Sequence, residues 1–189
     1  MPKQNLTLAS LLLGALLLLL AGCETWMKGG AVYSESKGAF SIRAPDGWMY
    51  ATSFGHDFIA SKDGLILQQI WIAHRELKDA LPNSKRVLKD SLQPYEVAEA
   101  IVDDLRADHA LLNLEIKENV PAVVGGKPGF KISYNFRTGE KLRLSETAYG
   151  CIAGGKLWLL RYRAPSRYYF ERDAATFEAT AKSFQFGKS

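Results

Sequence analysis

Cysteine and histidine are scarce in this sequence, and their scarcity argues against several kinds of chemistry. The 189 residues include two cysteines and three histidines, too few for a disulfide framework or a histidine-rich metal centre. The sequence also lacks a glycine-rich phosphate-binding pattern, and no serine has the spacing of a nucleophile elbow. We therefore expect a protein that is not an enzyme and needs neither a cofactor nor a metal.

A strong excess of either charge is also missing. The 24 lysines and arginines stand against 20 aspartates and glutamates, which gives a formal net charge of +4. Domains that bind nucleic acid usually gather a much larger basic excess on one face. The composition therefore argues against a nucleic-acid partner.

Long hydrophobic runs are absent except at the N-terminus. Lys3 precedes this one run, and no charged residue occurs from Asn5 to Gly22. A short positive region followed by an apolar stretch of this length is typical of a secretory signal peptide. The alternative is a membrane-spanning helix, but such a helix needs about 20 apolar residues and this stretch is slightly shorter.

The apolar run ends in Leu20-Ala21-Gly22-Cys23, which resembles the lipobox of bacterial lipoproteins. The resemblance implies that a signal peptide, residues 1–22, is removed and that the Cys23 thiol receives a diacylglyceryl group. More than one acyl chain on Cys23 would anchor the chain to a membrane without help from the protein. An ordinary signal peptide cleaved nearby is the alternative. After lipidation Cys151 would be the one free thiol, so no internal disulfide would form.

The residue after Cys23 bears on which membrane holds the chain. In lipoproteins of Gram-negative bacteria an aspartate at this position commonly signals retention in the inner membrane. The residue here is Glu24. The resemblance therefore implies a lipid-anchored protein of the cell envelope, in the outer membrane and facing the periplasm.

Residues 23–38 have the composition of a lipidated tether, since glycine, serine and charged residues predominate and few side chains could be buried. Residues 39–189 then form a single domain, which is long enough for a real core.

Strand patterns come first in this domain, followed by a helix, four strands and a second helix. The apolar stripe of the first helix runs from Pro94 to about His109, and that of the second contains Phe170 and Phe177. Short glycine-bearing connections between the four later strands predict consecutive antiparallel hairpins, and hence an α+β fold. The predicted strands are 40–43, 54–60, 65–73, 114–123, 127–137, 142–152 and 156–164.

Two short motifs at the start of the domain resemble the entry motif of PsbP-like domains. They are Phe40-Ser41-Ile42 and Pro45-Asp46-Gly47-Trp48, and we expect Trp48 to be buried. The Leu157-Trp158-Leu159-Leu160 strand is also similar to the C-terminal half of that family. The resemblance covers residues 39–186 and implies an antiparallel sheet packed between helices, an α/β/α sandwich. Members of the family dock onto other macromolecules and share no catalytic site.

Two groups with possible reactivity have simpler explanations. Cys151 lies in an apolar strand, where a cysteine is usually a small buried side chain. Asp104, Asp108 and His109 are close together in the sequence, but they fall opposite the apolar stripe, as on a solvated helix face.

Basic residues alternate with apolar residues on three of the predicted strands. If these strands are neighbours, the basic side chains gather at adjacent positions and form a docking surface. The alternative is that such residues only face water, or that Glu140, Glu146 and Glu171 neutralise them. The residues concerned are Lys131, Arg137, Arg143, Arg161 and Arg163.

Together these features predict a membrane-anchored, non-enzymatic lipoprotein that is a binding or accessory module for an envelope protein or assembly. The alternative is a carrier of a small molecule or an ion, which would use a pocket between the sheet and the helices. A deep pocket with inward polar groups favours the carrier, whereas a broad exposed basic or aromatic surface favours docking.

Overall fold

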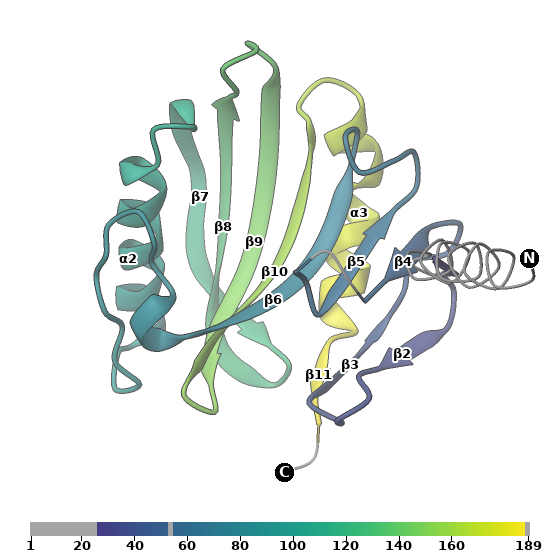
Figure 1. Cartoon of the computed structure of the whole chain (residues 1–189), viewed down its shortest axis with the longest axis horizontal. Helices are drawn as coiled ribbons and strands as arrows, with labels where there is room; N and C mark the ends of the chain where they lie inside the picture. The colour runs from purple at the N-terminus through teal and green to yellow at the C-terminus, as the bar shows by residue number, and fades with distance from the viewer. Residues whose placement is uncertain (1–25, 53–54, 188–189) are drawn as a thin grey trace, which may run out of the picture.

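A large antiparallel sheet forms the centre of the molecule, with one helix packed on each face (Figure 1). The computed structural model describes residues 26–52 and 55–187. The predicted signal peptide and Cys23 lie outside the described residues. The predicted α+β class is confirmed, with the helices on opposite faces of the sheet.

The sheet has eight strands within the described residues, and every neighbouring pair is antiparallel. In spatial order they are β1 (Met27–Lys28), β4 (Met49–Ala51), β5 (Phe58–Ser61), β6 (Gln69–Glu76), β10 (Lys156–Pro165), β9 (Arg143–Ala153), β8 (Lys127–Arg137) and β7 (Leu112–Val124). A second, three-stranded sheet contains β11 (Gln185–Phe186), β3 (Phe40–Arg43) and β2 (Val32–Ser34).

The two helices pack on different parts of the large sheet. Helix α2 (Pro94–Ala107) begins with a proline, which is tolerated there because the first N–H groups of a helix have no partner within the helix. Gln93 and Glu96 form a capping box at the same end of the helix. It contacts β7, β8 and β9, whereas α3 (Tyr169–Lys182) contacts β9, β10 and β3. On its own face, α2 therefore leaves β10 and β6 uncovered.

Alternation along the strands gives each helix its own core. On β8 the even-numbered residues from Phe130 to Phe136 are buried in the core under α2. On β10, Trp158, Leu160 and Tyr162 point the other way, into the core under α3. Trp48 belongs to this second core and is 2% exposed, as predicted.

Part of the predicted tether belongs to the folded domain. Met27 and Lys28 pair with β4, and residues 32–34 pair with β3. Only glycine fits at position 29, because a Cβ atom there would lie 2.0 Å from the carbonyl oxygen of Pro45, which is far too close. The folded domain therefore includes residues 27–34, which precede residue 39.

The strand predicted at 65–73 begins four residues later, at Gln69. Leu65 to Leu67 instead form a turn, in which the Leu67 N–H group donates to the Gly64 carbonyl at 3.0 Å, and Ile66 is 90% exposed. The turn is fixed from outside by Gln68, whose side-chain amide donates to Asp173 of α3 at 2.8 Å. Because Gln68 and Asp173 are far apart in the sequence, the residues around Gln68 give no indication of this turn.

Candidate ligand-binding groove

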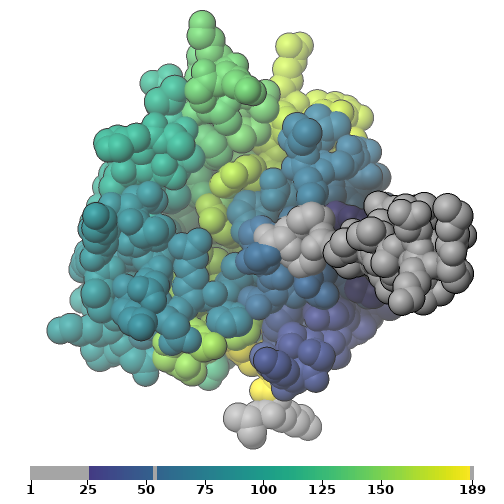
Figure 2. All heavy atoms as spheres, in the orientation of Figure 1, coloured from purple at the N-terminus to yellow at the C-terminus, as the bar shows by residue number. Residues whose placement is uncertain are grey.

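The uncovered part of the sheet beside α2 forms a groove, which we call the α2 groove. It has a volume of about 470 Å³ and lies between β6 and β10 on one side and α2 with the loop of residues 77–93 on the other. Figure 2 shows it as a hollow between the teal atoms of α2 and its loop and the blue atoms of β5 and β6. Yellow-green atoms of β10 lie at its base.

The strand register explains which side chains make the floor of the α2 groove. Leu157, Leu159, Arg161 and Arg163 of β10 all point to the α2 side, because residues two apart share a face of a sheet. Arg161 lies opposite Trp71 of β6, and Arg163 lies opposite Glu146 of β9. The floor is thus apolar at one end and charged at the other.

Arg161 and Arg163 share a single buried carboxylate, that of Glu146. The Nε group of Arg161 donates to Glu146 Oε1, and that of Arg163 donates to Oε2 at 2.5 Å. Arg161 also donates through Nη2 to the Tyr134 hydroxyl at 2.8 Å. The Glu146 side chain is fully buried, whereas those of Arg161 and Arg163 are 23% and 30% exposed. Burial alone would raise the pKa of Glu146, but the two guanidinium groups outweigh it and hold that pKa below its usual value.

Aromatic rings hold both guanidinium groups in place. The Cζ atoms of Arg161 and Arg163 lie 4.9 and 5.3 Å from the centre of the Trp71 ring. Arg163 also lies 5.3 Å from the centre of the Phe136 ring. Cation–π stacking of this kind restricts the planes of the two guanidinium groups.

His56 is a neutral imidazole at the rim of the α2 groove. Its Nδ1 atom is buried, and no hydrogen-bond partner for it exists among the described residues. Its ring lies 5.9 Å from that of Trp71. Burial and then the positive charge of Arg161 lower the pKa of His56, so the imidazole is uncharged at neutral pH.

Asp104 fixes the opposite wall of the groove, and the prediction of a solvated face is wrong for this residue. It is 8% exposed, and its carboxylate accepts hydrogen bonds from the backbone and side chains of Asn83 and Ser84, at 2.7 to 3.2 Å. These bonds tie the loop of residues 77–93 to α2. Asp104 is therefore engaged in holding the wall.

The predicted basic residues do not share one face of the sheet. Lys131 of β8 pairs with Tyr149 of β9, and Tyr149 pairs with Leu160 of β10, so these three side chains share one face of the sheet. Arg161 follows Leu160 directly and therefore points to the opposite face. Lys131 is paired with Glu118 and Glu178 at 3.1 Å each.

Arg137 and Arg143 lie directly opposite each other on the same side as Lys131, and Arg143 is 3.8 Å from Glu115. The structure thus separates Lys131, Arg137 and Arg143 from Arg161 and Arg163. Arg161 and Arg163 are both paired with Glu146, as expected from the alternative in which glutamates neutralise the basic residues.

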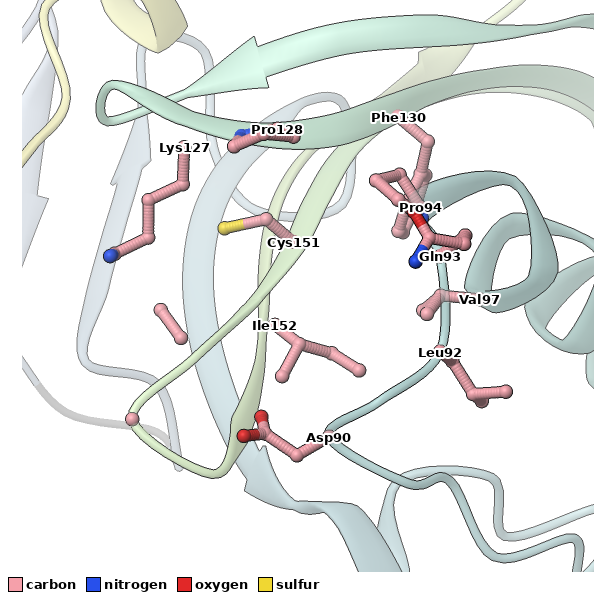
Figure 3. A pocket seen from close by; sticks show the side chains of 12 residues that line it. Asp90, Leu92, Gln93, Pro94, Val97, Lys127, Pro128, Phe130, Cys151 and Ile152 are labelled. Carbon is pink, nitrogen blue, oxygen red and sulfur yellow. The ribbon is translucent and has the colours of Figure 1, made fainter.

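Cys151 is a buried free thiol, as predicted. It lines a second hollow of about 390 Å³, where Figure 3 shows its side chain and that of Lys127 on the side away from Pro94 and Val97 of α2. Burial raises the pKa of the thiol to about 11, so it stays protonated at neutral pH.

No group of three or more histidine, cysteine, aspartate or glutamate side chains within residues 26–52 and 55–187 is arranged to hold a metal ion. No helix among the described residues is long and apolar enough to cross a membrane.

Three solved structures share this architecture at low sequence identity. Cyanobacterial PsbP (CyanoP) from Synechocystis sp. PCC 6803 is 16% identical, with a TM-score of 0.56 over 88% of this chain and 95% of that one. A mutant of the protein Mog1 is 10% identical, with a TM-score of 0.54 over 86% and 98%. LpqN, involved in cell envelope biogenesis of Mycobacterium tuberculosis, is 11% identical, with a TM-score of 0.53 over 84% and 90%. No protein-family model and no curated protein matches the sequence. The chain therefore has a PsbP-like fold, as its sequence motifs predict.

Proposed function

We propose that this chain is a membrane-anchored, non-enzymatic lipoprotein of the bacterial envelope, and that it acts as an accessory module for a neighbouring envelope protein or assembly. In this proposal a lipid on Cys23 holds the domain at the outer membrane, on the periplasmic side. The lipobox-like sequence before Cys23 is the basis for the anchor.

The observation that carries the proposal is the short distance between the predicted anchor and the folded domain. β1 begins at Met27, four residues after Cys23, and is hydrogen-bonded to β4. Four extended residues span at most about 14 Å. A domain held this closely meets the same membrane neighbours continually, and this high effective concentration makes weak contacts sufficient.

The surface nearest the anchor has features of a contact site. β1 is at the edge of the large sheet in the described part of the chain. Met27 and Met49 are 36% and 37% exposed there, and methionine adapts readily to a partner surface. We therefore place the docking contact at the β1–β4 edge.

The likeness to LpqN supports a role in the envelope, since LpqN is involved in cell envelope biogenesis. Two local features support binding over catalysis. The Cys151 thiol is protonated at neutral pH, and the Glu146 carboxylate is engaged by two arginines. Neither group is poised to react with a substrate.

The proposal is tested by photo-crosslinking in living cells. A crosslinking amino acid in place of Lys28, on β1, should capture one defined envelope protein. The matched control replaces Glu140, an exposed residue of the β8–β9 connection. The same capture from both positions would contradict docking at the β1–β4 edge.

A second arm tests the anchor distance. An insertion of about 20 glycine and serine residues between Cys23 and Trp26 gives the domain a flexible reach and should weaken the Lys28 crosslink. The same insertion at Gly139 should not. Capture that survives Cys23→Ser unchanged would show that the anchor plays no part in docking.

A further inference from the structure

We infer that the α2 groove binds a small organic anion, with the acidic head on the Arg161–Arg163 pair and an apolar body along Leu159 toward α2. This site is separate from the docking edge proposed above, and it needs only the folded domain.

The charged end of the groove floor has more positive than negative groups. Glu146 supplies one negative charge to two guanidinium groups, so the cluster has an unbalanced positive charge. Glu146 itself is fully buried and its two oxygens are engaged. An anion at this end of the groove therefore meets the guanidinium groups, which are partly exposed, whereas the carboxylates of Asp104 and Asp108 belong to the α2 wall.

The Arg163 guanidinium has hydrogen-bond donors available to a ligand. Arg163 donates through Nε to Glu146, and neither of its Nη nitrogens has a hydrogen-bond partner among residues 26–52 and 55–187. A planar guanidinium with two free donors matches the two oxygens of a carboxylate or a phosphate. Because Trp71 and Phe136 already fix its plane, little conformational entropy is lost when an anion binds.

His56 adds a buried polar atom for which no hydrogen-bond partner exists among the residues that the structure describes. Its buried Nδ1 atom lies at the rim of the same groove, against Trp71. A buried polar atom without a partner is destabilising by about 1–3 kcal/mol. An acidic head seated beside Trp71 would provide that partner if the imidazole turned toward the groove.

Apolar side chains lie beside the polar ones in the rest of the groove, and they determine the class of ligand. Beyond Arg161 the floor continues as Leu159 and Leu157, and the α2 wall contributes Ile101 and Leu105. The volume of about 470 Å³ falls within the range of small-molecule sites, which is about 300 to 1,000 Å³. An alkyl or aromatic acid, or an alkyl phosphate, combines the two required parts.

The test is isothermal titration calorimetry on the full chain in nanodiscs of zwitterionic lipid. The probes are hexanoate, hexyl phosphate, hexanol, acetate and inorganic phosphate. We expect hexanoate and hexyl phosphate to bind with one-to-one stoichiometry. Hexanol lacks the charge, and acetate and phosphate lack the apolar body, so each should bind about tenfold more weakly or not at all.

Arg163→Gln is the decisive variant. It removes the free donors but leaves Glu146 paired with Arg161, so no buried charge is left unmatched. Hexanoate affinity should fall by at least about tenfold. Arg137→Gln is the matched control, because it removes an equal charge from the opposite face and should leave the affinity unchanged, including any uptake by the lipid.

Ala73→Leu is a second variant that keeps every charge. Ala73 lines the groove on β6 opposite Leu159, so a larger side chain there should weaken hexanoate binding and spare acetate binding. The inference is overturned if hexanoate does not bind at millimolar concentration, or if it binds equally to the wild type and Arg163→Gln. It is also overturned if hexanol or inorganic phosphate binds as tightly as the two-part probes. None of these results affects the crosslinking test, which reports on the β1–β4 edge in cells.

Discussion

Glu146 is the residue on which the charged end of the groove depends. Replacing it with glutamine would leave Arg161 and Arg163 without their carboxylate, and removing one partner of a buried ion pair costs about 3–5 kcal/mol. Because both arginines are partly exposed, we expect Glu146→Gln to cost about 3 kcal/mol, the low end of that range. Thermal unfolding should show this loss, with exposed Glu140→Gln as the control. An unchanged melting temperature would contradict the ion-pair cluster.

The same carboxylate predicts a dependence of stability on pH. The pKa of Glu146 is lower in the folded chain than its usual value of 4.5. The stability it contributes is therefore fully present above pH 4.5 and is lost as the pH falls through the lowered pKa. Denaturant unfolding of the wild type at a series of pH values should show a fall in this acidic range, and the fall should be shallower for Glu146→Gln. Parallel curves for the two proteins would exclude a lowered pKa.

Trp48 tests the core on the α3 side. It is 2% exposed and lies in the same cluster as Phe40 and Trp158. Trp48→Ala should reduce the free energy of unfolding by about 3–5 kcal/mol, as large deletions in a core do. A soluble mutant chain with an unchanged denaturation midpoint would be incompatible with this placement.

Single residues differ in how far the sequence predicts them. Burial of Cys151 follows from the apolar strand around it, and burial of Trp48 follows from the motif that resembles PsbP-like domains. The separation of Lys131 from Arg161 does not, because it depends on the parity of the register between three strands. A register one residue different would have placed them together.

At the scale of secondary-structure elements, the contact between α2 and its preceding loop has a specific prediction. Asp104→Ala removes four hydrogen bonds to Asn83 and Ser84, and the loop should then open more often. Faster hydrogen exchange at the Asn83 and Ser84 amides would measure this, together with a stability loss of about 2 kcal/mol. Glu99 is also on α2 but is exposed and accepts a hydrogen bond from Asn119 of β7, so Glu99→Ala should change neither result. Equal exchange in both variants would rule out the loop attachment.

Long elements with a clear period are predicted well, and short ones are not. The strands at 127–137 and 156–165 and the helix at 94–107 lie within one or two residues of their predicted bounds. β1 and β2 have two and three residues and no measurable alternation, and their pairing depends on strands elsewhere in the chain. This is why residues 27–34 resemble a tether in the sequence.

At the scale of the whole molecule, the two-faced sheet could be predicted but the groove could not. The order of strands and helices predicts an antiparallel sheet in an α+β fold, and the resemblance to PsbP-like domains implies that helices cover both of its faces. The α2 groove exists because α2 covers β7 to β9 and stops short of β10. That lateral position is determined by packing between side chains far apart in the sequence, and so it has no local pattern.

We propose that Cys23 holds the whole molecule at a membrane, and mass spectrometry of the protein isolated from its host can detect this anchor. We predict a mature N-terminus at Cys23, with a diacylglyceryl group on the thiol, and an uncleaved, unlipidated precursor for Cys23→Ser. A wild-type N-terminus at any other residue, or an unmodified Cys23 thiol, would rule out a lipid anchor at Cys23.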